Sequence, residues 1–145
     1  MDTTTVPSPS VLPAAPPRPR RSLWLLRGVL TVYLLGVLAQ PVLAGMFLTG
    51  DVDAIDAHAD IGTALEAMTM LVVGASLLYV VGGHGRVWIL PVAVVLFIAV
   101  GLQIGMGYLR RLEIHIPLGV AIVTASVILT AWAWSPAAAR SRAAR

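Results

Sequence analysis

Two histidines stand in the same short pattern. His58 is followed by Gly62 after four residues, and His115 is followed by Gly119 at the same interval, with a hydroxyl residue seven positions further on in both cases. On a helix that advances about 100° per residue, positions four and eleven after the histidine lie within about 40° of it. Each copy would therefore present an imidazole, a gap and a hydroxyl along one helix face.

A glutamine precedes each copy and completes a faint internal repeat. Gln40 lies 18 residues before His58, whereas Gln103 lies 12 residues before His115, so the two connections differ in length. Parallel two-span repeats are a recognised way of building membrane bundles. Because these residue types are common, the repeat by itself is moderate evidence.

Four apolar stretches must position these residues. Of 145 residues, 58% are apolar and 12% are charged, about half the charged share of soluble domains, and the mean hydropathy is +0.87. A helix needs about 20 mostly apolar residues to cross a bilayer. Four stretches meet that requirement, at about Leu23–Leu48, Ala57–Val81, Val87–Tyr108 and Glu113–Trp134.

The short connections between these stretches predict the fold class. They force neighbouring helices to run antiparallel, so we expect an all-α integral membrane four-helix bundle, up-down-up-down, over residues 22–135. Residues 1–21 are Pro-rich and predicted to be disordered, and residues 136–145 form an Arg-rich tail. Val42-Leu43-Ala44 could instead end a cleaved signal peptide, but the apolar stretch exceeds the usual length of about 7–15 residues.

The arginines predict the orientation. Eight of the ten fall on the side of the two termini and the second connection, and only Arg110 and Arg111 fall on the other side. The positive-inside rule then places both termini in the cytoplasm, with the chain as a multi-pass protein of the plasma (cytoplasmic) membrane. No basic surface with interleaved aromatic residues is present, so nucleic acid is not an expected partner; the lipid bilayer is.

The matched depth of the two histidines indicates a cofactor. Both open a stretch that runs in the same direction, so both should lie near the outer face. Two imidazoles on facing helices can ligate one iron from opposite sides, and the absence of a Cβ at Gly62 and Gly119 lets a flat macrocycle approach the backbone. We therefore predict that His58 and His115 hold one b-type haem.

The surroundings of the predicted site leave alternatives open. Arg110 and Arg111 are the only outward-facing cations and could pair with haem propionates. The chain has no cysteine, so thiolate metal sites and thioether-attached haem are excluded. The histidines could also be purely structural, bind another metal or form a proton relay.

Glu66 is the least expected residue in an apolar stretch. It lies two turns beyond His58, where a charge costs about 2.5–3.5 kcal/mol on insertion scales. Three readings remain open: the carboxyl group is protonated, it is hydrogen-bonded to Gln40 or Gln103, or it belongs to a proton path.

The plan of the chain resembles one half of haem A synthase, a four-helix membrane bundle with a histidine opening the second span and another opening the fourth. It is also similar in layout to small bis-histidine b-type membrane cytochromes and to small four-span membrane proteins of unassigned function. The resemblance covers about Leu34 to Trp134 and implies that His58 and His115 are axial ligands. In that family an acidic residue stands just before the first ligand, and Asp56 or Asp53 is the nearest counterpart here.

The resemblance also bears on assembly and function. Haem A synthase has two such halves, so a homodimer of this chain would restore the eight spans. We expect electron transfer or haem handling near the outer face, with a respiratory or other membrane-complex partner. The alternative is a cofactor-free accessory protein or subunit of a larger membrane complex, and whether the protein is an enzyme stays open.

Overall fold

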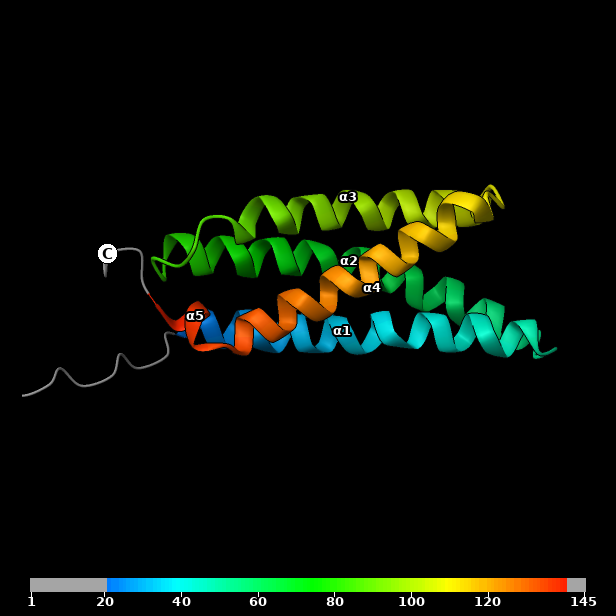
Figure 1. The fold of residues 1–145 in the computed structure, drawn as a ribbon, viewed down its shortest axis with the longest axis horizontal. Coiled ribbons are helices and arrows are strands. Elements are labelled where there is room, and N and C mark those ends of the chain that lie inside the picture. The colour runs from blue at the N-terminus through cyan, green and yellow to red at the C-terminus, as the bar shows by residue number, and fades with distance from the viewer. Residues whose placement is uncertain (1–20, 141–145) are drawn as a thin grey trace, which may run out of the picture.

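The computed structural model describes residues 21–140, and within that range the regular structure is entirely helical (Figure 1). Residues 1–20 of the tail expected to be disordered, and the last part of the predicted Arg-rich tail, fall outside the described residues. Arg21, which was also expected to be disordered, begins the first helix instead. The helices are α1 (Arg21–Leu48), α2 (Asp53–Val81), α3 (Ile89–Tyr108), α4 (Leu112–Trp134) and the short α5 (Pro136–Ala139).

The four long helices form a bundle in which each helix has two neighbours. α1 packs against α2 and α4, and α3 packs against the same two helices, so α2 and α4 lie diagonally across the bundle. Consecutive helices run antiparallel (Figure 1). The turns α1–α2 and α3–α4 lie at one end, called here the histidine end. The α2–α3 loop and α5 lie at the opposite, terminal end.

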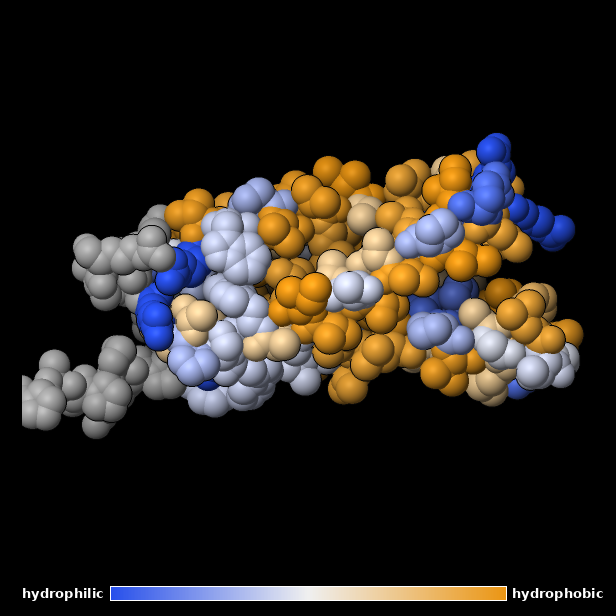
Figure 2. Space-filling view, in the orientation of Figure 1, coloured by the Kyte–Doolittle hydropathy of each residue, from blue (hydrophilic) through white to orange (hydrophobic). Residues whose placement is uncertain are grey.

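Each long helix can cross a membrane by length and composition, which confirms a multi-pass, all-helical protein. The shortest, α3, has 20 residues and thus extends about 30 Å, close to the hydrocarbon thickness of a bilayer. The middle of the molecule is covered by apolar side chains, and hydrophilic residues gather toward its two ends (Figure 2). This is the surface that a lipid-embedded bundle presents.

The helix ends differ little from those expected. α2 begins at Asp53, four residues before the predicted start, and Asp53 and Asp56 both lie in its first turn. Acidic side chains there suit the positive end of the helix dipole. The sequence pattern did not predict α5, which occupies the first part of the C-terminal tail.

The buried core lies in the terminal half of the bundle. The core layer nearest the histidine end consists of Val37, Leu65, Val100 and Ile122, one side chain from each long helix. Beyond that layer, residues 38–48, 55–64, 101–108 and 112–121 include no buried residue. The α1–α2 and α3–α4 tips diverge there (Figure 1), and the surface is hollowed between them, with hydrophilic residues in the recess (Figure 2).

Polar contacts and aromatic rings close the terminal end. Arg27 is 8% exposed, donates from Nε to the carbonyl of Ala133 at 2.8 Å, and stacks on Trp24 and Trp134. The Tyr79 hydroxyl donates to the carbonyl of Ala138 and so fixes α5 against the bundle. The two helix pairs are therefore tied together firmly at this end.

Candidate functional site

The structure brings the two histidines together at the histidine end. His58 lies in the second turn of α2 and His115 in the first turn of α4. Although these helices are diagonal neighbours, the two ring centroids are 6.1 Å apart, and the ring planes are inclined by 53°. Both residues are half-buried.

The same hydrogen bond holds each ring. His58 Nδ1 lies 3.2 Å from the carbonyl oxygen of Gln40, and His115 Nδ1 lies 2.9 Å from that of Gln103. A carbonyl oxygen only accepts, so each Nδ1 must carry the proton and donate it. In the neutral ring, Nε2 then has a free lone pair that can bind a metal or accept a proton.

The two glutamines also approach the two glycines of the repeat. A Cβ on Gly62 would lie 3.8 Å from Gln40 Oε1, and a Cβ on Gly119 would lie 2.9 Å from Gln103 Nε2. The spaces that the sequence suggested for a flat ring are thus faced by glutamine amides. These amides and the imidazoles form two matching groups, one in each half of the chain.

A third glycine, Gly107, packs directly on one imidazole. A Cβ at this position would lie 3.1 Å from Cε1 and 3.3 Å from Nδ1 of His115. This contact was not predicted from the sequence. No local sequence pattern marks Gly107, because the contact depends on how α3 is rotated against α4.

Glu66 lies deeper, next to the last core layer. Its Oε1 faces Gly101 on α3, where a Cβ would come within 3.2 Å. Its Oε2 is buried without a hydrogen-bond partner among the described residues, and so is Nε2 of Gln40. Of the readings left open for Glu66, the hydrogen bond between its Oε2 and the Gln40 amide is therefore not formed.

Tyr33 adds a polar group that the sequence did not single out. Its side chain is 0% exposed, and its hydroxyl lies beside Ser126 and Glu66 without completing a hydrogen bond. Ser126 instead donates to the carbonyl of Ile122 within its own helix. Tyr33 could not be recognised as a site residue from the sequence, because it lies within a continuous apolar run.

The two outward arginines lie in the connection before α4. Both are exposed, and Arg111 forms a salt bridge through Nε with Glu113. Arg110 has a positive φ of 56°, the left-handed conformation of the tight α3–α4 turn. The acidic residues nearest the first histidine, Asp53 and Asp56, are exposed on the first turn of α2.

The donor set limits which metal groups the site could hold. Among the described residues, no group of three or more His, Cys, Asp or Glu side chains could enclose a metal ion. A metal at this site would receive two imidazoles from the protein and its other ligands from elsewhere. That requirement would suit a haem iron, to which the porphyrin supplies further ligands, and disfavours a bare structural zinc.

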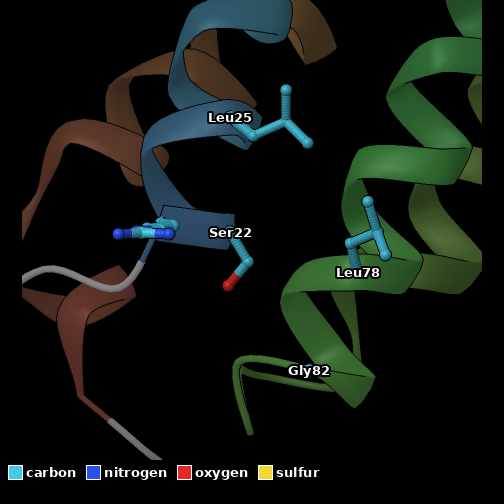
Figure 3. Close-up of a pocket in the computed structure, with 5 residues that line it drawn as sticks. Ser22, Leu25, Leu78 and Gly82 are labelled. Atoms are coloured by element: carbon cyan, nitrogen blue, oxygen red, sulfur yellow. The ribbon is translucent and has the colours of Figure 1, made fainter.

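A further hollow lies at the other end of the bundle. It measures about 480 Å³ and is lined by Arg21, Ser22, Leu25, Leu78 and Gly82, between the start of α1 and the end of α2 (Figure 3). Its walls are mostly apolar, and it opens to the surface. Without converging titratable groups, this hollow is a poor place for chemistry, which leaves the histidine pair as the candidate site.

The fold and the site together define a class: a multi-pass, all-helical protein with two imidazoles meeting between diagonal helices. No family of known proteins, no curated protein and no solved structure matches the chain. The function must therefore be argued from the site itself.

Proposed function

We propose that the protein binds one b-type haem between His58 and His115 and serves electron transfer or haem handling. The observation that carries the proposal is the paired arrangement of the two rings, 6.1 Å apart, with each Nδ1 directed to a backbone carbonyl. Histidines that ligate metals almost always donate their second ring N–H to such an acceptor, which fixes the tautomer and raises ligand basicity.

The ring separation suits a shared metal ion. With metal–nitrogen bonds of about 2 Å, two ligands on opposite sides of one ion hold their nitrogens about 4 Å apart and their ring centroids about 6 Å apart. The separation of 6.1 Å agrees with this value.

The histidine half also has room that a packed core would not leave. Beyond the last core layer, the four helix segments contain a single buried residue, Ala54. A macrocycle would have to displace the Gln40 and Gln103 amides, which are flexible side chains rather than backbone. Arg110 could pair with a propionate directly, whereas Arg111 would have to exchange its partner Glu113. Bound haem would supply a one-electron carrier whose potential depends on ligand identity and burial.

The same proposal includes an orientation. Arg21, Arg27, Arg86 and Arg140 lie at the terminal end, and Arg110 with Arg111 at the histidine end. Under the positive-inside rule the terminal end faces the cytoplasm, and the haem lies near the outer face of the plasma membrane. A homodimer or a respiratory partner would contact the apolar outer faces of the bundle.

One observation favours a second candidate, a cofactor-free subunit of a membrane complex. Each histidine already joins two consecutive helices through its hydrogen bond, and each glycine space is already faced by a glutamine amide. Histidines in this role hold helices together and need no metal.

The absorption spectrum of the purified full-length protein, expressed with ample haem, separates the two candidates. The haem proposal expects a Soret band with α and β bands on reduction, lost in His58→Ala and in His115→Ala. His84→Asn is the matched control, because His84 is exposed on the α2–α3 loop at a positive φ of 50° that asparagine tolerates. A colourless wild-type protein would refute haem binding and leave the structural role.

A further inference from the structure

Glu66 lies where the packed half of the bundle meets its splayed half. It follows Leu65, and the glycine that it faces, Gly101, follows Val100; both Leu65 and Val100 belong to the last core layer. The carboxyl group is thus the last charged group that a molecule entering from the histidine end would meet before the sealed core.

Four buried polar atoms, spread from the repeat glycines to just below the last core layer, lack hydrogen-bond partners among the described residues. They are Glu66 Oε2 and Gln103 Oε1, which accept, Gln40 Nε2, which donates, and the Tyr33 hydroxyl, which does both. They come from three different helices. Buried polar atoms in folded proteins are nearly always bonded, and where protein partners are lacking, ordered water takes their place.

Water can reach this cluster from one end only. Toward the histidine end, Ala54 in the first turn of α2 is the one buried residue that the described helices contain beyond the core layer of Val37, Leu65, Val100 and Ile122, and the surface is hollowed there (Figure 2). Toward the terminal end the interior is filled by fully or almost fully buried side chains, among them Leu30, Val72, Leu96 and Leu129. The splayed half of the bundle is thus a vestibule, open at the histidine end and closed by the last core layer, which we call its floor.

We propose that this vestibule is hydrated and that Glu66 is a proton-binding site at its floor. The ligands are water and one proton: hydronium entering from the histidine end gives its proton to the Glu66 carboxylate, an O–H bond forms, and water returns by the same route. The site requires no haem, so a negative result for haem binding would not refute it.

The neighbours of Glu66 leave it as the proton acceptor of the cluster. From α1, Tyr33 interacts with it electrostatically, and from α3 the backbone at Gly101 lies against it. The titratable groups of α4 are His115 and Glu113, both in its first turn at the histidine end, and His58 lies two turns away on α2 itself. No arginine lies at this level of the bundle to hold the carboxylate in a permanent ion pair.

Infrared spectroscopy on haem-free protein in lipid nanodiscs tests the proton site. A titration should show one protonated-carboxyl band that is absent from Glu66→Gln, is retained in the exposed control Glu113→Gln, and shifts promptly on transfer to D₂O. In Gly101→Ala the added methyl group would press on Glu66 Oε1 and should move the pH midpoint at which the Glu66 band appears. Gly105→Ala, whose Cβ meets nothing within 4 Å, should leave that midpoint unchanged.

Cysteine labelling tests the vestibule, since the chain has no cysteine of its own. A water-soluble maleimide should modify Gly62→Cys, where the added group meets only Gln40 at 3.8 Å. The same reagent should leave Ala75→Cys unmodified, because Ala75 lies in the sealed half at 4% exposure.

Two results would overturn the proposal. Identical carboxyl bands in wild type and Glu66→Gln at every pH would show that Glu66 binds no exchangeable proton. A Glu66 band that fails to exchange in D₂O, together with an unreactive Gly62→Cys, would show that the cluster is sealed from water.

Discussion

The contact between Gly107 and His115 offers a sharp test of how the imidazole is held. In Gly107→Ala the new methyl group would lie 3.1 Å from Cε1 and 3.3 Å from Nδ1 of the ring. The ring must retreat by a few tenths of an ångström, and Nδ1 is the atom that donates to the Gln103 carbonyl at 2.9 Å. The substitution therefore strains the hydrogen bond that orients the proposed ligand.

The expected size of the effect follows from two opposing contributions. Alanine in place of a helical glycine stabilises by about 0.5–1 kcal/mol, and a weakened hydrogen bond costs about 0.5–1.5 kcal/mol. Gly107→Ala should thus be close to neutral in stability. Gly105→Ala lies on the same helix with nothing within 4 Å of its Cβ. It should keep the whole gain, so its free energy of unfolding should rise by about 0.5–1 kcal/mol.

Haem affinity should separate the same two variants more strongly. Disturbing a partner that orients a metal ligand typically costs about 10–100-fold in affinity, so Gly107→Ala should bind haem that much more weakly while Gly105→Ala binds as wild type does. Titration of haem followed at the Soret band, with thermal unfolding in the same detergent, gives both numbers. Equal affinity and equal melting of the two variants would refute the idea that ring position matters.

Three further predictions concern the core, the terminal end and redox chemistry. Leu30→Ala, at 0% exposure, should lower the free energy of unfolding by about 2–5 kcal/mol, whereas Leu38→Ala, at 41% exposure, should change it by at most about 0.5 kcal/mol. Arg27→Met removes the bond to Ala133 and both tryptophan contacts, and should cost about 2 kcal/mol in thermal unfolding. In haem-loaded protein, proton uptake by Glu66 on reduction should make the midpoint potential fall by up to about 59 mV per pH unit, and Glu66→Gln should flatten that slope.

The helices themselves could be read from the sequence because membrane spans depend on local composition. About twenty apolar residues suffice to identify a span, and each observed helix end lies within four residues of the predicted one. The matched depth of His58 and His115 followed equally directly, since both open helices that start at the same end of the bundle. For these features no tertiary information was needed.

The details of the site depend on helix rotation, which the sequence does not encode locally. The sequence placed a gap beside each histidine, but which side chain faces it depends on how α1 and α3 turn toward α2 and α4. The Gln40 and Gln103 carbonyls, the Gly107 contact and the buried Tyr33 all arise in this way. α5 also depends on tertiary structure, because this four-residue helix is held by a hydrogen bond from the distant Tyr79 to the carbonyl of Ala138.

The distribution of hydrogen bonds between helices indicates what a bridging ligand would do. At the terminal end, side-chain bonds cross between α1 and α4, from Arg27 to Ala133 and from Thr130 to Leu30. At the histidine end, the two side-chain bonds join only consecutive helices, α1 to α2 and α3 to α4. The protein is thus two helical hairpins clamped at one end, and an iron shared by His58 and His115 would supply the missing link at the other.

Binding of haem by both histidines should therefore draw the two hairpin tips together measurably. Spin labels at Leu48→Cys and Leu109→Cys, exposed positions on opposite tips, should report a broad distance distribution without haem and a narrower one when haem is added. Labels at Leu25→Cys and Val87→Cys, near the clamped terminal end, should not respond, because the bonds there already fix the separation. If the tip distribution were equally broad in both states while haem was bound, the ligand would lie on one hairpin only, and the shared-iron geometry would be wrong.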